Sequence, residues 1–278
     1  IVCWGIRKNL IRKDEDEFFM ALLGRYDKGH LCRYTSIDNL FTTLDKCSHA
    51  MCCPVSMNDP NEGSYADSKL TYNVNTSRTE QAIASDNGCY ILSCTDEEQE
   101  DDLTMWRLYA DDAKGVCIQY EIDKEIKKNS CYFLAKVSYG ERDGKHKALE
   151  FLNELMAESL QNGWYFRLSR WYIWRYFFKS HVYKSENEVR LLYMPGVNES
   201  ITKIWYKDSC NGLFNHLVTF SISKRNNTFP LKLSKILIGP NIKSSRQNIE
   251  QIAYMVKDKN IDTAENFKVS GSSIKNYR

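Results

Sequence analysis

The chain has 278 residues, of which 42% are hydrophobic and 13% are aromatic, and this apolar share is ample for a buried core. Because the formal net charge at pH 7 is only +2, the composition excludes an intrinsically disordered chain. No apolar run approaches the ~18 residues of a membrane-spanning helix, and the chain does not open with the charged and then apolar segments of a secretory leader. We therefore expect a compact soluble protein with no membrane partner.

Helices and strands are predicted from hydrophobic periodicity and from the turn residues between apolar runs. In the first half, we predict helices over residues 15–24, 37–44 and 105–109 and strands over residues 30–34, 50–55, 89–93, 116–120 and 132–137. In the second half, we predict a long helical region over residues 145–179, strands over residues 189–193, 201–206, 217–223, 231–238 and 267–269, and a helix over residues 246–257.

The order of these elements indicates the fold class. Strands and helices are interspersed without the regular βαβ alternation of a parallel sheet. We therefore predict an α+β fold with a mixed, largely antiparallel sheet and flanking helices. We assign residues 1–30 to an N-terminal helical segment and residues 31–278 to a single α+β domain.

Charge is divided unevenly along the chain. Residues 1–160 hold 19 Lys and Arg against 28 Asp and Glu, whereas residues 161–278 hold 19 against 8. A basic C-terminal half is suited to a phosphate-bearing ligand or a nucleic acid. The alternative interpretation is that the two halves pack together and partly neutralise each other.

Ten cysteines are present, and none of them forms a CxxC pair. Most lie inside apolar runs, where cysteine behaves as a small buried hydrophobe in a reducing compartment, so we expect a cytoplasmic protein. The group closest to a metal site is Cys47, His49, Cys52 and Cys53. Since a strand points alternate residues to opposite faces, these four side chains cannot converge, and we predict no metal.

An aromatic segment follows at residues 164–178 and reads as a helix that is hydrophobic on all sides, which favours burial in the core. Arg167, Arg170, Arg175 and Lys179 interleave with it. Aromatic and basic residues mixed in this way can also stack bases and neutralise phosphates, of NAD or of a nucleic acid, and this alternative stays open.

Five short blocks of the chain together resemble a bacterial family of unknown function, DUF2971. The blocks are Arg33-Tyr34-Thr35-Ser36, the turn Met57-Asn58-Asp59-Pro60 with Asn61-Glu62-Gly63, the segment from Met105 to Ile118, the segment from Glu186 to Leu191, and the closing Ser273-Ile274 with Tyr277-Arg278. The resemblance covers roughly residues 31–278. One departure is Val189, where the family usually has Trp. The family implies no activity, so function is argued from the residues.

Glu186 and Glu188 are the strongest candidates for chemistry. If both lie on a strand, their carboxylates project from the same face, where each raises the pKa of the other. Such a pair can act as a base or can stabilise a cation. The alternative is a solvated strand start, with Arg190 on the same face as an ion-pair partner.

The order of the motifs also resembles that of ADP-ribosyltransferases. That layout has a basic or Tyr residue on the first strand, a Ser-x-Ser/Thr segment on a later strand and then Glu-x-Glu. Here the matching residues are Arg33 or Tyr34 with the adjoining Thr35, then Ser93 and Thr95, then Glu186 and Glu188. The resemblance implies that the first group holds NAD, that the second props the glutamates, and that Glu188 stabilises an oxocarbenium-like transition state while Glu186 assists toward the acceptor.

Two further pairs are candidates for the cofactor site. Asn58 and Asp59 belong to the sequence Asn-Asp-Pro, which favours a turn on its own. Such a turn can also place polar groups at the mouth of a pocket. Trp106 and Tyr109 are three residues apart on a predicted helix and share a face, where they serve the core or border a cofactor.

The first hypothesis is a cytoplasmic enzyme that resembles ADP-ribosyltransferases, takes NAD as substrate and modifies a macromolecule or hydrolyses NAD, as toxins and phage-defence effectors do. The rival is a non-catalytic module that binds nucleic acid or protein. Under the first hypothesis, Glu188→Gln keeps the size of the side chain, so folding should hardly change while activity falls by orders of magnitude.

Overall fold

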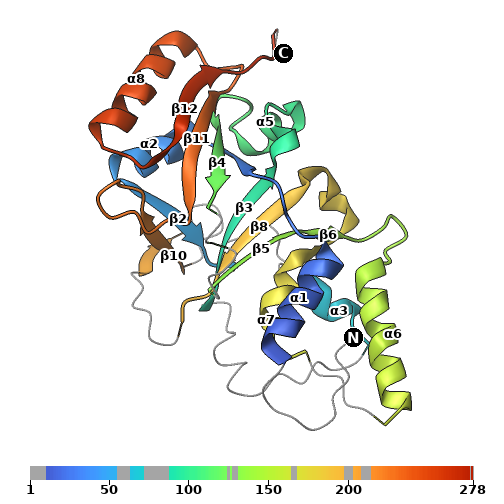
Figure 1. Cartoon of the computed structure of the whole chain (residues 1–278). Coiled ribbons are helices and arrows are strands. Elements are labelled where there is room, and N and C mark those ends of the chain that lie inside the picture. Colours follow the sequence, from blue (N-terminus) through green and yellow to red (C-terminus); the bar gives the residue numbers. More distant parts are fainter. Residues whose placement is uncertain are drawn as a thin grey trace.

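A computed structural model describes residues 11–54, 63–71, 88–123, 126, 131–163, 168–196, 203–207, 214–275 and 277. In these residues ten strands form one sheet, and almost all neighbouring strands run antiparallel (Figure 1). The strands are β1 (His30–Thr35), β2 (Ser48–Cys52), β3 (Tyr90–Asp96), β4 (Val116–Ile122), β5 (Tyr132–Lys136), β8 (Glu188–Tyr193), β9 (Lys203–Lys207), β10 (Phe214–Ser221), β11 (Leu231–Ile238) and β12 (Thr263–Gly271). The main path of the sheet follows the order β12-β11-β4-β1-β3-β2-β10-β9.

The sheet branches at β3. Along one side, residues 90–95 of β3 pair with β8, which in turn pairs with β5. On the other side, Thr95 and Asp96 pair with β1, whereas Ile91 pairs with β2. Strand β3 is therefore the point at which the three branches of the sheet meet, and it carries the Ser93–Thr95 segment of the expected site.

Helices cover the sheet at three places (Figure 1). They are α1 (Ile11–Leu23), α2 (Ile37–Asp45), α3 (Ser64–Lys69), α5 (Leu103–Tyr109), α6 (Lys147–Gln161), α7 (Trp171–Trp174) and α8 (Ser245–Asp258), with short 3-10 turns η3 (Glu97–Gln99), η5 (Arg175–Phe177) and η6 (His181–Glu186). A separate two-stranded parallel ribbon joins β6 (Ser138–Tyr139) to β7 (Phe178–Lys179). These elements confirm the predicted α+β class with a mixed, largely antiparallel sheet.

Strand alternation divides the apolar side chains between the two faces of the sheet. One face holds the first core, which includes Leu31, Leu40, Tyr120, Leu191, Ile236 and Val256 and lies under α2 and α8. The opposite face holds a second core with Phe19, Leu152, Trp174 and Leu192 under α1, α6 and α7, and a third core with Cys32, Tyr34, Trp106 and Leu237 under α5. We call this opposite face the site face.

Residues 164–167, which include Arg167, lie outside the described residues, and the remainder of the aromatic segment is core, as its composition predicts. Trp171, Trp174, Phe177 and Phe178 are buried in the second core, and the ring of Trp174 stacks on Phe19 of α1 at 5.3 Å. One expected element is wrong in extent, because the long helix over residues 145–179 is interrupted. Helix α6 ends at Gln161, and Gly163 follows it with a φ of +71°, a conformation that ends helices.

The two oppositely charged halves of the chain are interleaved. Strand β11 from the basic half lies beside β4 from the acidic half, and β8 from the basic half lies between β3 and β5. The halves therefore pack against each other across the whole sheet. The described part of the chain holds no helix that is long and apolar enough to cross a membrane.

Candidate active site

Three neighbouring strands bring four of the expected residues to the site face, namely Tyr34, Ser93, Thr95 and Glu188. Thr95 of β3 lies opposite Glu188 of β8, and Ser93 lies opposite Arg190. Thr95 also lies opposite Cys32 of β1, two residues before Tyr34. Because side chains that face each other across paired strands project from the same face, these residues share the site face with Tyr34.

Glu188 is held by two cations. Its Oε1 accepts a hydrogen bond of 2.7 Å from Arg190 Nε, and its Oε2 accepts one of 3.0 Å from Arg190 Nη2. Arg190 is fully buried and also donates from Nη1 to the Tyr176 carbonyl. Burial alone would raise the pKa of the Glu188 carboxyl, but Arg190 and Lys179 lower it to about 2. Glu188 is therefore a fixed, ionised carboxylate.

Lys179 joins the two glutamates. Its Nζ lies 2.8 Å from Oε2 of Glu186 and 2.8 Å from Oε2 of Glu188. The three side chains are 8%, 12% and 4% exposed, in the order Lys179, Glu186 and Glu188. Two carboxylates thus converge on one positively charged atom, and Glu186 is the more accessible of the two.

The expectation that both glutamates lie on one strand is wrong. Strand β8 begins at Glu188, whereas Glu186 is the last residue of the 3-10 turn η6. Asn187 between them adopts a left-handed conformation, with a φ of 43°, and breaks the strand alternation. The carboxylates nevertheless meet, because Lys179 bridges them. The ion pair of Glu188 with Arg190 exists, but it is buried rather than solvated.

Two tyrosines complete the surroundings of the carboxylates. Tyr109 of α5 donates its hydroxyl to Oε1 of Glu186 at 2.5 Å, and the hydroxyl of Tyr139 accepts from the backbone N–H of Glu188 at 2.9 Å. Burial, followed by the nearby carboxylates, raises the pKa of both phenols far above the usual value. Both hydroxyls therefore stay protonated at neutral pH, and Tyr109 remains a donor.

Thr95 and Ser93 lie beside the two carboxylates but do not bond to them. The Thr95 hydroxyl reaches the carbonyl of Glu186 at 3.0 Å, so it supports the turn rather than the carboxylate. The Ser93 carbonyl accepts from Arg33 Nη1 at 2.7 Å. The Ser93 hydroxyl is buried and finds no hydrogen-bond partner within the described residues.

Tyr34 and Trp106 hold the loop that leads into α5. The Tyr34 hydroxyl donates to the Gln99 carbonyl at 2.6 Å and accepts from the Asp102 N–H at 2.9 Å. The Tyr34 ring meets the ring of Trp106 edge to face at 4.9 Å, and Trp106 is fully buried. Both residues therefore belong to the third core and border the carboxylates through Tyr109, three residues after Trp106.

Two expected residues are not brought to this site, and two others lie outside the described residues. Arg33 and Thr35 alternate with Tyr34 along β1 and so project from the opposite face, where Thr35 accepts from the Asn39 amide of α2 at 3.1 Å. Asn58 and Asp59 lie outside the described residues. The separation of Arg33 and Thr35 from Tyr34 follows from alternation alone, so the sequence already contained that signal.

Lys179 and Tyr139 were missed as site residues. They come from neighbouring positions of the β6–β7 ribbon, a pairing of two residues per strand that is too short for hydrophobic periodicity to reveal. The usable signal was Lys179 itself, a cation that directly follows the apolar run Tyr176-Phe177-Phe178. A lysine drawn into a core needs a carboxylate partner. Within the described residues, no group of three or more His, Cys, Asp or Glu side chains is placed to hold a metal ion.

Comparison with known proteins identifies one family. Residues 105–191 match the model of a family described as "Protein of unknown function (DUF2971)". This segment contains Trp106, Tyr109, Glu186 and Glu188, together with Lys179, so it includes the whole charged group described above. No curated protein and no solved structure matches the chain. The resemblance to DUF2971 that the sequence blocks indicate is thereby confirmed over residues 105–191, which hold two of the five blocks.

Proposed function

We propose that this chain, whose residues 105–191 match the model of the DUF2971 family, is an ADP-ribosyltransferase-like enzyme that cleaves NAD. The observation that carries the proposal is the convergence of the Glu186 and Glu188 carboxylates on a single cation, the ammonium of Lys179. The group lies on adjoining strands in the order that the motif resemblance expects, with Tyr34 on β1, Ser93 and Thr95 on β3 and Glu188 on β8.

Cleavage of NAD requires stabilisation of positive charge. The bond between C1′ of the ribose and the nicotinamide nitrogen breaks, and its electron pair leaves with the nicotinamide, which becomes neutral. C1′ is left with oxocarbenium character until a nucleophile, water or a macromolecular acceptor, bonds to it and gives up a proton. Carboxylates that are already ionised and fixed stabilise such a charge without reorganising at the moment of reaction.

The two carboxylates then have distinct tasks. Glu188 supplies a permanent negative charge, because Arg190 keeps it ionised and oriented. Glu186 is the more exposed, and its hydrogen bond from Tyr109 fixes the orientation in which it can assist the acceptor. Lys179 holds the position of the positive charge before substrate arrives, and its flexible stem lets the ammonium move aside when NAD binds.

The experiment measures release of nicotinamide from NAD by the whole chain at millimolar NAD. We expect turnover by the wild-type chain, a loss of at least about 100-fold in Glu186→Gln and a smaller loss in Tyr109→Phe, since oriented charge at the transition state accounts for factors of this size. Glu250→Gln, which removes an exposed carboxylate from α8, is the matched control and should keep full activity.

Absence of both NAD binding and nicotinamide release in the folded wild-type chain would overturn the proposal. That result would favour the rival, a non-catalytic module that binds nucleic acid or protein. If NAD is consumed, labelled NAD added to a cell extract will separate transfer to a macromolecule, as in toxins and phage-defence effectors, from simple hydrolysis.

A further inference from the structure

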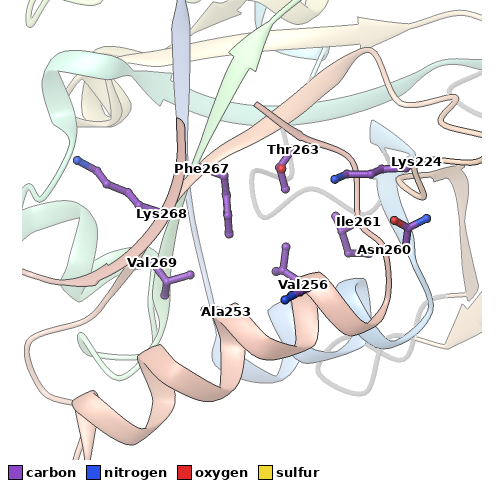
Figure 2. Close-up of a pocket in the computed structure, with 10 residues that line it drawn as sticks. Lys224, Ala253, Val256, Asn260, Ile261, Thr263, Phe267, Lys268 and Val269 are labelled. Atoms are coloured by element: carbon purple, nitrogen blue, oxygen red, sulfur yellow. The ribbon is translucent and has the colours of Figure 1, made fainter. Parts of the chain in front are cut away.

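A pocket lies at the edge of the sheet formed by β12 (Figure 2), several strands away from Glu188 on β8. It has a volume of about 300 Å³ and lies between the C-terminal half of α8 and β12, on the side of the sheet that holds the first core. Its lining comes from three segments, namely Lys224 in the turn after β10, residues 253–261 of α8 and its C-terminal turn, and residues 263–269 of β12.

The charge of this pocket is uniformly positive. Lys224, Lys257 and Lys268 are among its lining residues, and no acidic side chain is. None of the three lysines forms an ion pair within the described part of the chain, whereas Lys28, Lys136, Lys147, Lys179, Lys235 and Lys259 all do. Lysines with no carboxylate partner gather here, so the pocket is suited to an anion.

The floor of the pocket is apolar and carries one aromatic ring. Val256 and Ile261 are buried beneath it, and Figure 2 shows the Phe267 ring extending from β12 toward α8. Lys224 reaches over the pocket toward Thr263, whereas Lys268 leads away from it. A flat ring can therefore lie against Phe267 with an anionic group beside Lys224.

We propose that this pocket binds a nucleotide unit, with its base against Phe267 and its phosphate held by Lys224 and Lys257. Aromatic stacking combined with lysine contacts to phosphate is the usual chemistry of such recognition. The volume is at the small end of the range for small-ligand pockets, which suits one nucleotide rather than a dinucleotide such as NAD. The nucleotide is either free or part of a single strand, and both present the same ring and phosphate.

The test titrates the whole chain with AMP and, separately, with a ten-residue deoxyadenosine strand, by calorimetry at low salt. We expect binding of at least one probe in the wild-type chain. Lys224→Gln/Lys257→Gln should weaken it about tenfold or more, because displaced counterions and phosphate contacts drive such binding. Phe267→Leu, which keeps apolar bulk but removes the ring, should weaken it severalfold. The matched control is Lys243→Gln/Lys275→Gln, which removes two exposed lysines elsewhere.

The outcomes distinguish a free nucleotide from a nucleotide within a strand, and binding in this pocket from binding at the carboxylate site. AMP binding points to a free nucleotide, whereas binding of the strand alone, with a steep salt dependence, points to a nucleotide within a nucleic acid, and both support the pocket. Binding that survives in Lys224→Gln/Lys257→Gln but disappears in Glu186→Gln would overturn the proposal, because the probe would then occupy the carboxylate site. If neither AMP nor the strand binds, the proposal is also overturned, whatever the result with NAD.

Discussion

A buried ion pair determines how Glu188 responds to substitution. Both of its carboxylate oxygens are bonded to Arg190, and Lys179 contacts one of them. The sequence alone predicts that Glu188→Gln leaves folding almost unchanged, whereas these contacts favour a loss of stability. An amide keeps the volume but not the charge, and the fully buried guanidinium of Arg190 would lose the carboxylate that accepts from two of its nitrogens.

We predict that Glu188→Gln lowers the free energy of unfolding by about 3 kcal/mol, because removal of one charge from a buried ion pair is strongly destabilising. Urea denaturation of the variant and the wild type measures this loss. Glu250→Gln, whose ion pair with Arg246 is exposed, should change the free energy by less than about 0.5 kcal/mol. A Glu188→Gln variant as stable as the wild type would show that the pair with Arg190 is not needed for the fold.

The same pair explains why Glu186 is the better residue for testing catalysis. Its side chain is three times as exposed as that of Glu188, and its contacts are one tyrosine and one lysine rather than a buried guanidinium. A change in activity after Glu186→Gln can therefore be measured on a folded protein. The activity of a Glu188 variant must be interpreted together with its measured free energy of unfolding.

Among the elements, the described residues after β12 contact the loops on either side of α5. Asp101, just before α5, accepts from Ser272 Oγ at 2.5 Å, from the Ser273 N–H at 2.6 Å and from Trp106 Nε1 at 2.8 Å. Farther along, the Tyr277 hydroxyl donates to Asp112 at 2.5 Å. The segment after β12 therefore holds the helix that carries Tyr109, and two sequence blocks far apart in the chain belong to one structural unit.

We predict that Asp101→Asn lowers the free energy of unfolding by about 1–2 kcal/mol, because one of the two accepting oxygens is replaced by an NH2 donor and the remaining bonds lose their charged acceptor, while the side chain keeps its shape. Asn also tolerates the left-handed conformation of this position, where φ is 64°. Removal of residues 272–278 should produce a similar loss. The two changes combined should be clearly less than additive, since they break the same contacts. Additive losses in urea denaturation would contradict this coupling.

The sequence predicted elements well where apolar runs are long and poorly where geometry depends on single residues. The predicted strand at residues 231–238 matches β11, and the predicted helix at residues 246–257 lies within one residue of α8. The left-handed Asn187 and the two-residue β6–β7 ribbon left no periodic signal. The order of the motifs predicted that the site residues of β1, β3 and β8 lie together. The place of Lys179 beside them could not be predicted, because it depends on tertiary packing.

At the scale of the whole molecule, the cores on the two faces of the sheet enclose different buried polar groups. On the first-core face, His49 and Tyr120 are both buried, and His49 Nε2 lies 2.5 Å from the Tyr120 hydroxyl. Phe229 stacks on the His49 ring at 4.4 Å. Burial, and secondarily the charge of Arg33, lowers the pKa of His49 to about 3. His49 is thus neutral in the fold at every pH at which the protein is expected to work.

This depressed pKa predicts how stability depends on pH. In the unfolded chain His49 has an ordinary pKa of 6.5, so between pH 6.5 and about 3 the unfolded state binds a proton that the folded state does not. Stability from this residue is therefore complete above pH 6.5 and is lost as the pH falls, with a slope that approaches about 1.4 kcal/mol per pH unit. Glu188 adds a loss in the same direction at lower pH, below its ordinary value of 4.5.

We predict that His49→Phe/Tyr120→Phe removes the His49 part of this slope. Replacing both partners leaves neither ring with an unpaired polar group, and the new ring keeps the stacking on Phe229. The free energy of unfolding, measured in urea at intervals from pH 7.5 to pH 5, should fall less steeply with acid in the double variant than in the wild type. Tyr120→Phe alone keeps the titrating imidazole and should keep the wild-type slope. Equal slopes in all three proteins would mean that the folded state accepts the proton on His49 as readily as the unfolded chain does.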